Sequence, residues 1–144
     1  MTVQRRDMRR LLLLFVIMLA NSVFAGAAER SVIYHIIDES QAIRAMNNAK
    51  NHLVADPDVH ITFVVQSGGM HFLQADASDE KGRAYGPYID ELSMAGVEFK
   101  ACGNTMMTMN LTLDDLNFGV ERVESGMVEV TRLQLEEGYA YVHP

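Results

Sequence analysis

The sequence predicts a three-layer α/β/α domain, in which helices cover both faces of a five-stranded and mainly parallel sheet. Short runs rich in β-branched residues, typical of buried strands, alternate with longer segments in which apolar residues recur at helical spacing. Successive parallel strands need crossover connections, and the intervening helices supply them. About 119 residues follow a distinct N-terminal segment, which is enough for one domain with one hydrophobic core.

The N-terminal segment, residues 1–25, has the composition of a secretory signal peptide. Four arginines precede an apolar block at residues 11–20, and the small-residue sequence "VFAGAA" follows shortly afterwards. This apolar run is shorter than the roughly 20 residues that span a bilayer, which argues against a membrane anchor. We therefore expect cleavage after Ala25 and a periplasmic protein that consists of one domain, residues 26–144.

The predicted mature chain is strongly acidic. The whole chain carries a formal charge of −7, and loss of the four arginines and one aspartate of residues 1–25 changes this charge to −10. Such a surface repels nucleic acid and anionic membranes. We expect neither of them as a partner once the signal peptide has been removed.

The first half of the domain alternates between strand and helix. Residues 30–37 form a continuous apolar run and predict a strand, and residues 38–56 place apolar side chains at helical spacing. Residues 58–66 predict a second buried strand. A glycine turn that leads into a short helix is expected at 67–76, and a polar loop at 77–84 completes this half.

The next two elements lead to the single cysteine of the chain. Residues 85–96 predict a helix that begins near Pro87 and ends at Gly96. Residues 97–102 predict a short third strand, whose last residue is Cys102. The thiol is therefore expected at the carboxyl end of a strand.

The last third of the chain predicts two further strands and two helical segments. Residues 110–119 predict a helical turn with Thr112 as its N-cap, and residues 120–125 predict a fourth strand. A helix is favoured at 126–138, although its β-branched residues leave a strand open for part of this segment. Residues 139–144 complete the sheet as the fifth strand.

Cys102 has no second cysteine with which to form an intramolecular disulfide. In an oxidising compartment such a residue is either buried and inert or a reactive thiol. Ligands of open parallel sheets bind at the carboxyl ends of the strands, where three polar clusters follow the first three predicted strands. These clusters are His35–Asp38, Gln66–Gly69 and Cys102–Asn104, and we expect them to lie close together at one edge.

The first two clusters each have a functional and a structural interpretation. His35 would act as a base toward Cys102, with Asp38 orienting it, or both residues would serve the following helix as a hydrogen-bond partner and a cap. The N–H groups of Gly68 and Gly69 would cradle a small anion such as a persulfide, or these glycines would only form a turn.

The third cluster is expected to favour the thiolate form of Cys102. Gly103 and Asn104 tolerate left-handed turns, and such a turn would direct backbone N–H groups at the sulfur and at a ligand bound there. A helix start at Thr112 would add to this effect if the loop brings it near, whereas the acidic surface opposes it. We therefore predict a modest lowering of the thiol pKa.

Other kinds of site lack support in the sequence. The histidines show no metal-ligand spacing, and no Walker, G-x-G-x-x-G or G-x-S-x-G motif occurs. Three methionines follow the thiol, and they are better explained as core or subunit-contact residues than as copper ligands: Met106, Met107 and Met109. We expect neither a metal nor a cofactor. Because residues 102–113 combine apolar side chains with few charges, we expect a homo-oligomer.

Six stretches of the sequence resemble a known protein family: "YHIIDE", "NNAKNHL", "QSGGMHFL", "GVEFKACGNTM", "LTLDDL" and "GMVEVTRLQLEEGYAYVHP". Over residues 31–144 the chain resembles the DsrE/DsrF-like family of sulfur-relay-related proteins, particularly its stand-alone branch. The resemblance implies a compact α/β domain that assembles as trimers or hexamers. In the sulfur-relay members a cysteine carries sulfur as a persulfide and passes it to a partner, and Cys102 is the matching position.

Two functional hypotheses follow from the residues and the resemblance together. In the first, the protein is a periplasmic sulfur carrier or sulfurtransferase in which Cys102 is the nucleophile, with a sulfur donor or acceptor protein as its partner. In the second, it is a non-catalytic homo-oligomeric module, in which Cys102 is structural and the strand-end loops bind a small ligand or a protein. The exposure and the pKa of the thiol distinguish the two hypotheses, because the thiolate is the attacking species.

Overall fold

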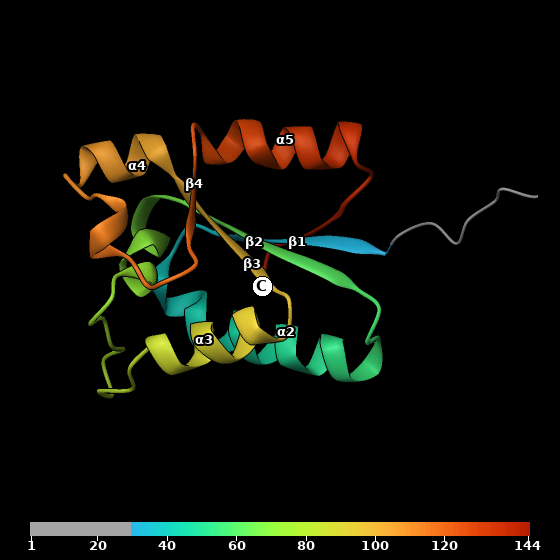
Figure 1. Cartoon of the computed structure of the whole chain (residues 1–144), viewed down its shortest axis with the longest axis horizontal. Helices are drawn as coiled ribbons and strands as arrows, with labels where there is room; N and C mark the ends of the chain where they lie inside the picture. The colour runs from blue at the N-terminus through green and yellow to red at the C-terminus, as the bar shows by residue number, and fades with distance from the viewer. Residues whose placement is uncertain (1–29) are drawn as a thin grey trace, which may run out of the picture.

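A computed structural model describes residues 30–144, and the predicted signal peptide lies outside them. Five parallel strands form one sheet in the order β4-β3-β2-β1-β5. The predicted α/β class and the five strands are therefore confirmed, and the sheet is parallel throughout (Figure 1). No helix of the described part is long and apolar enough to cross a membrane.

The three central strands form the buried middle of the sheet, whereas the two edge strands are short and partly exposed. Burial follows composition, because the central strands consist largely of β-branched and aromatic residues, which pack well on a pleated surface. The strands are β1 (Ser31–Ile36), β2 (His60–Val65), β3 (Glu98–Cys102), β4 (Glu121–Val123) and β5 (Ala140–Val142).

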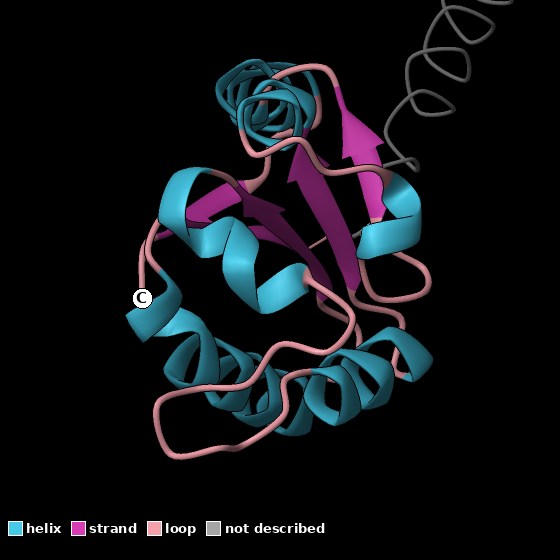
Figure 2. Cartoon of the chain, turned by 90° about the vertical axis from the view of Figure 1, so that its left-hand side faces the viewer, coloured by secondary structure: helices cyan, strands magenta, loops and turns pink. Residues whose placement is uncertain are grey.

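Helices cover both faces of the sheet, as Figures 1 and 2 show. Two of them, α2 (Ala42–Ala55) and α3 (Gly86–Met94), lie on one face, and α4 (Gly103–Thr108) and α5 (Gly126–Glu136) lie on the other. Three short 3-10 helices lie in the connections: η1 (Glu39–Gln41), η2 (Ser67–Leu73) and η3 (Leu113–Asp115). The arrangement is the three-layer sandwich that the alternation predicts.

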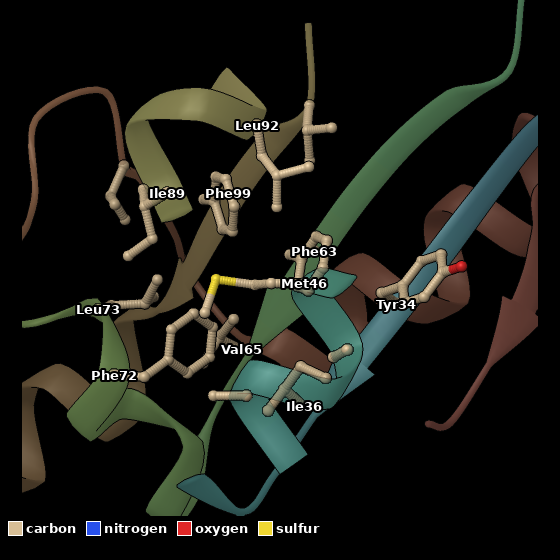
Figure 3. Close-up of a cluster of buried hydrophobic side chains, with 14 of the residues drawn as sticks. Tyr34, Ile36, Met46, Phe63, Val65, Phe72, Leu73, Ile89, Leu92 and Phe99 are labelled. Carbon is tan, nitrogen blue, oxygen red and sulfur yellow. The ribbon is translucent and has the colours of Figure 1, made fainter. Parts of the chain in front are cut away.

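The two faces of the sheet have cores of different size. Under α2 and α3, Phe63 stacks between Tyr34 and Phe99 at ring-centroid distances of 5.2 and 4.9 Å, and Figure 3 shows this cluster. Each fully buried aromatic ring contributes about 1.5–3 kcal/mol to folding. The smaller core lies under α5 and consists of Ile33, Val64, Val130, Leu133 and Tyr139.

The chain after Cys102 differs from the sequence-based expectation. We predicted a left-handed turn at Gly103 and Asn104, and that prediction is wrong, because α4 begins at Gly103 and neither residue has a positive φ. The glycine at 103 instead leaves room for the flexible guanidinium end of Arg122. A Cβ atom there would lie 2.7 Å from the guanidinium group of Arg122.

Two expectations for the last third of the chain are confirmed. Thr112 and Asp115 form a reciprocal capping box at η3. Residues 126–138 were expected to form a helix, with a strand as the alternative for part of the segment. The structure has a helix over Gly126–Glu136, because Val130 and Leu133 lie on one helical face and pack on the sheet.

Candidate thiol site at the carboxyl edge of the sheet

The three polar clusters follow three strands that are adjacent in the sheet. β1 and β2 are parallel neighbours with Ile36 opposite Val65, and β2 and β3 are parallel neighbours with Val65 opposite Ala101. All three strands therefore end at the same edge. One residue further along, Gln66 stands opposite Cys102, and both side chains alternate onto the face that α5 covers.

Cys102 is buried, with 4% of its surface exposed. It is the last residue of β3 and the N-cap of α4, and its Cβ lies 3.3 Å from where a Cβ on Gly126, the first residue of α5, would stand. Two helices thus begin beside one sulfur atom. Their backbone N–H groups point at the region where a thiolate would need partners.

The pKa of the Cys102 thiol is lowered from its ordinary value. Burial is the largest single effect and raises the pKa, because it disfavours the charged form. The backbone N–H groups of Gly126, Thr105 and Asn104, together with the Thr105 hydroxyl, outweigh burial by hydrogen bonding to the sulfur. The expected lowering of the pKa therefore arises from N–H groups of α4 and α5. Thr112, whose helix start was expected to help if it lay near the sulfur, is not one of the groups that lower the thiol pKa.

A second set of contacts orients the hydroxyl that faces the sulfur. The backbone N–H of Ser67 donates to Oγ1 of Thr105 at 3.1 Å. Ser67 has a φ of 52°, a left-handed conformation that is uncommon for a residue other than glycine. With its oxygen occupied as an acceptor by Ser67, the Thr105 hydroxyl keeps its proton available for the sulfur of Cys102.

Lys100 shares a face of β3 with Cys102, but its charge is matched elsewhere. Its Nζ lies 2.9 Å from Oε1 of Glu129 on α5 and 3.5 Å from Oε2 of Glu98. Arg132 also donates to Glu129, and mainly for this reason the pKa of Glu129 falls to about 2. The thiolate is therefore stabilised by backbone dipoles, and the nearby lysine is held by carboxylates.

His35 lies on β1, on the face that α5 covers. Its Nδ1 is 2.8 Å from the hydroxyl of Tyr141 on β5, and 5% of the residue is exposed. Burial, and then the nearby His143, lower the pKa of His35, while the Gln66 side chain acts in the opposite direction. The imidazole is thus neutral at physiological pH, as a general base must be.

Asp38 serves the following helical segment. Its Oδ1 accepts the backbone N–H of Ser40 at 2.8 Å, and mainly this hydrogen bonding to Ser40 lowers its pKa. Its side chain opens toward a hollow of about 560 Å³ that is also lined by Glu39, Lys81 and Tyr85. The structure therefore places Asp38 as a cap on η1, and His35 contacts β5 through Tyr141.

The predicted glycine cradle divides into two unlike positions. Gly69 packs on the backbone, because a Cβ there would lie 2.7 Å from the carbonyl oxygen of Ile36, and its N–H donates to the carbonyl of Gln66. Gly68 instead lines a hollow of about 430 Å³ between η2 and α4, together with Asn104 and Thr105. Cys102 does not line this hollow, but its neighbours in α4, Asn104 and Thr105, do.

Two residues that act on the sulfur carry no recognisable signal in a single sequence, and a third, Gln66, was predicted only as part of a polar cluster. Thr105 and Gly126 hydrogen-bond to the sulfur, and Gln66 packs against Gly126. Gly126 lies 24 residues after Cys102 in the printed sequence, and only the crossover that places α5 over β3 brings the two together. In the part of the chain that the structure describes, no group of three or more His, Cys, Asp or Glu side chains is arranged to hold a metal ion.

The fold and the site define an α/β protein with a buried, thiolate-stabilised cysteine at the carboxyl edge of a parallel sheet. The model of the DsrE/DsrF-like family matches residues 31–144, and the chain belongs to this family. None of the curated proteins compared with the chain matches it.

Solved structures with a similar fold include two proteins from different organisms. MTH1491 from Methanobacterium thermoautotrophicum, a protein of unknown function, is 33% identical with a TM-score of 0.72, and the match covers 80% of this chain and 99% of that one. The ychN protein from E. coli is 14% identical with a TM-score of 0.64, covering 79% and 99% of the two chains. The second likeness concerns the fold alone.

Proposed function

We propose that the protein is a thiol-based sulfur carrier or sulfurtransferase of the periplasm, with Cys102 as its nucleophile. The observation that carries this proposal is the set of donors at one sulfur atom: the N–H groups of Asn104, Thr105 and Gly126 and the hydroxyl of Thr105. Hydrogen bonds to the charged form favour that form. A thiolate at neutral pH is the species that attacks sulfane sulfur.

The proposed reaction has two balanced steps. The Cys102 thiolate attacks the outer sulfur of thiosulfate, a sulfur–sulfur bond forms, and sulfite leaves with the electron pair of the bond that breaks. The product is a deprotonated persulfide on Cys102. A thiolate of an acceptor then attacks the outer sulfur, takes it as a persulfide, and regenerates the Cys102 thiolate. No oxidant or reductant is consumed in either step.

The absence of a second cysteine is consistent with a sulfur carrier, because no other thiol of the chain can release the bound sulfur. A second cysteine nearby would attack the inner sulfur of the persulfide and release the cargo as an internal disulfide, and this chain contains no other cysteine. His35 is neutral and lies on the same face of the sheet, with β2 between its strand and that of Cys102, and it is the candidate base for the thiol proton. We propose that donors approach through the hollow lined by Ser67, Gly68 and Asn104.

A homo-oligomer, a trimer or a hexamer, is part of the same proposal. α5 turns Val130 and Leu133 toward the sheet and exposes three large apolar side chains on its outer surface. We call this surface the α5 outer face, and it consists of Met127, Val128 and Leu135. Exposed apolar patches of this kind mark subunit contacts. The predicted contact segment, residues 102–113, is mixed, since Met106 is buried in the core and Met107 is exposed.

One observation favours a second candidate function. Only 4% of Cys102 is exposed, as expected of a packed structural residue in a non-catalytic, homo-oligomeric module that binds a small ligand or a protein. In that case the hollow between η2 and α4 is the binding site, and the sulfur never reacts. Both functions keep the same fold and the same residues, and they differ in the chemistry of one atom.

Incubation of the mature protein with thiosulfate or polysulfide separates the two functions. Intact-mass measurement is expected to show the addition of one sulfur atom, which a reductant reverses and which Cys102→Ser abolishes. Transfer of this sulfur to a small thiol would establish the carrier step. If the wild-type protein takes up no sulfur and its folded thiol also resists alkylation, the carrier function is wrong and the binding module replaces it.

A further inference from the structure

We infer that Gln66 is the positioning residue of the Cys102 site: its side chain lies between the buried imidazole of His35 and the Gly126 backbone, and it holds the Gly126 N–H on the sulfur. This inference deepens the proposed function and depends on Cys102 acting as a thiolate. It concerns residues of three adjacent elements, β1, the end of β2 and the start of α5.

Gly126 is held tightly between Gln66 and Cys102. A Cβ atom on Gly126 would lie 2.6 Å from Oε1 and 3.5 Å from Cβ of Gln66, and 3.3 Å from Cβ of Cys102. The Gln66 side chain therefore leaves no room for a side chain on Gly126. Contact on both sides fixes where the first residue of α5 stands, and with it the direction of its N–H.

His35 supplies the second observation, which is independent of the thiol. His35 is buried, with 5% of its surface exposed. Its Nε2 is completely buried and has no hydrogen-bond partner within the described residues. A buried polar atom without a partner costs about 1–3 kcal/mol, so its persistence calls for an explanation. The imidazole is close enough to the Gln66 side chain to interact with it, but the geometry falls short of a full hydrogen bond.

These contacts form a row across one face of the sheet edge. Tyr141 meets Nδ1 of His35 at 2.8 Å, His35 faces Gln66, and Gln66 packs on Gly126. The row ends at Cys102. The imidazole is fixed by Tyr141 on one side, and its Nε2 has no hydrogen-bond partner within the described residues.

The other charged groups around the row lie on β3 and β4 and after β5. Lys100 on β3 pairs with Glu129 on α5 at 2.9 Å, and the guanidinium of Arg122 on β4 lies against Gly103. Nδ1 of His143, which follows β5, donates to the backbone carbonyl oxygen of His35, and His143 lowers the His35 pKa. Substitution of Gln66 leaves each of these contacts in place, which makes its effect on the thiol specific.

The test measures the pKa of Cys102 by thiolate absorbance near 240 nm in the full mature chain, with Cys102→Ser as the blank. This readout does not require the thiol to be accessible. Gln66→Ala is expected to raise the pKa by about one unit, a tenfold change in the ionisation constant, because Gly126 is released. Gln66→Met keeps the packing and removes the amide, and we expect a smaller rise. Gln134→Ala, the same change at an exposed position of α5, is the control and should change nothing.

His35→Gln tests the other end of the row, and it is expected to raise the thiol pKa in the wild-type background but not in Gln66→Ala. Far-ultraviolet circular dichroism and thermal unfolding establish that each variant is folded. Unchanged thiol pKa values in folded Gln66→Ala and His35→Gln would overturn the inference. Shifted pKa values without sulfur uptake would uphold the positioning role and reject the carrier function, whereas sulfur uptake with unshifted values would do the reverse.

Discussion

The backbone N–H of Ser67 donates to Oγ1 of Thr105 at 3.1 Å, and this hydroxyl in turn faces the sulfur of Cys102. The loop that follows β2 thus controls a donor that belongs to the helix after β3. The left-handed φ of 52° at Ser67 places its N–H for this contact. Backbone strain in one loop therefore contributes to the electrostatics of the thiol in the next.

The Thr105 hydroxyl is expected to lower the pKa of Cys102. Its loss in Thr105→Val should raise the thiol pKa by roughly half a unit to one unit, since a hydrogen bond to a charged group contributes about 1.5 kcal/mol. Alkylation rates followed from pH 5 to pH 10 measure the shift, because only the thiolate reacts. Thr105→Ser keeps the hydroxyl and should behave as the wild type. A wild-type profile for Thr105→Val would show that the N–H groups act alone.

Gly69 and Gly103 should differ in their tolerance of a methyl group. A Cβ on Gly69 meets the backbone oxygen of Ile36 at 2.7 Å, whereas a Cβ on Gly103 meets only the flexible end of Arg122. We expect Gly69→Ala to lose about 1–3 kcal/mol of unfolding free energy and Gly103→Ala to lose less than about 1 kcal/mol. Urea denaturation measures both values. Equal losses would contradict the tight packing of η2 on β1.

Glu129 is expected to stabilise the fold above about pH 4.5 and to lose this effect in acid. Its pKa falls from the ordinary 4.5 to about 2 in the folded protein. A lowered carboxyl pKa contributes stability that disappears as the pH falls from 4.5 toward 2. At pH 7 the substitution Glu129→Gln should lower the free energy of unfolding by about 1–3 kcal/mol. This loss is smaller than that for breaking a deeply buried ion pair, because the side chain of Arg132 is 36% exposed and solvent screens its charge.

The control for Glu129 is the exposed pair of Lys50 and Glu91, which meet at 2.7 Å. Glu91→Gln should change the unfolding free energy by less than about 1 kcal/mol, since solvent screens such pairs. Unfolding by urea at pH 7 and at pH 3.5 measures both variants. If Glu129→Gln keeps the wild-type difference between the two pH values, another group causes the acid sensitivity.

The α5 outer face is expected to mediate self-association. Replacement of Met127 and Leu135 by lysine places two charges on this face, and we expect the oligomer to dissociate in light-scattering measurements at micromolar concentration. Val54→Lys is a matched control on α2, because Val54 is 83% exposed and Leu135 is 81% exposed. A monomeric wild type, or a double variant that stays fully assembled, would contradict the proposed contact.

The α/β class could be predicted because it depends on local patterns. The apolar runs of β1 and β2 are continuous, since both faces of a central parallel strand are covered, whereas β3 carries Glu98 and Lys100 between its apolar residues. The helices between the strands repeat apolar side chains at helical spacing. Alternation of this kind also places Cys102 at the carboxyl edge. The capping box of Thr112 and Asp115 lies within four residues and is likewise a local feature.

The chain after Cys102 was mispredicted because local preference was overridden by tertiary contacts. Gly103 and Asn104 favour a turn by their intrinsic preferences, yet α4 begins at Gly103. The guanidinium of Arg122 lies against Gly103 in the folded protein. Arg122 is distant in sequence, so no pattern near Gly103 indicates this contact.

The sequence by itself determined the layers of the domain, the single thiol and the edge at which that thiol lies. Only the tertiary structure decided what surrounds the sulfur. The N–H of Gly126 comes from a helix 24 residues further along the chain, and the partners of Lys100 and His35 are Glu129 and Tyr141. Such contacts depend on the crossover of α5 over β3 and on the pairing of β5 with β1. A pattern of neighbouring residues carries no information about side chains that only folding brings together.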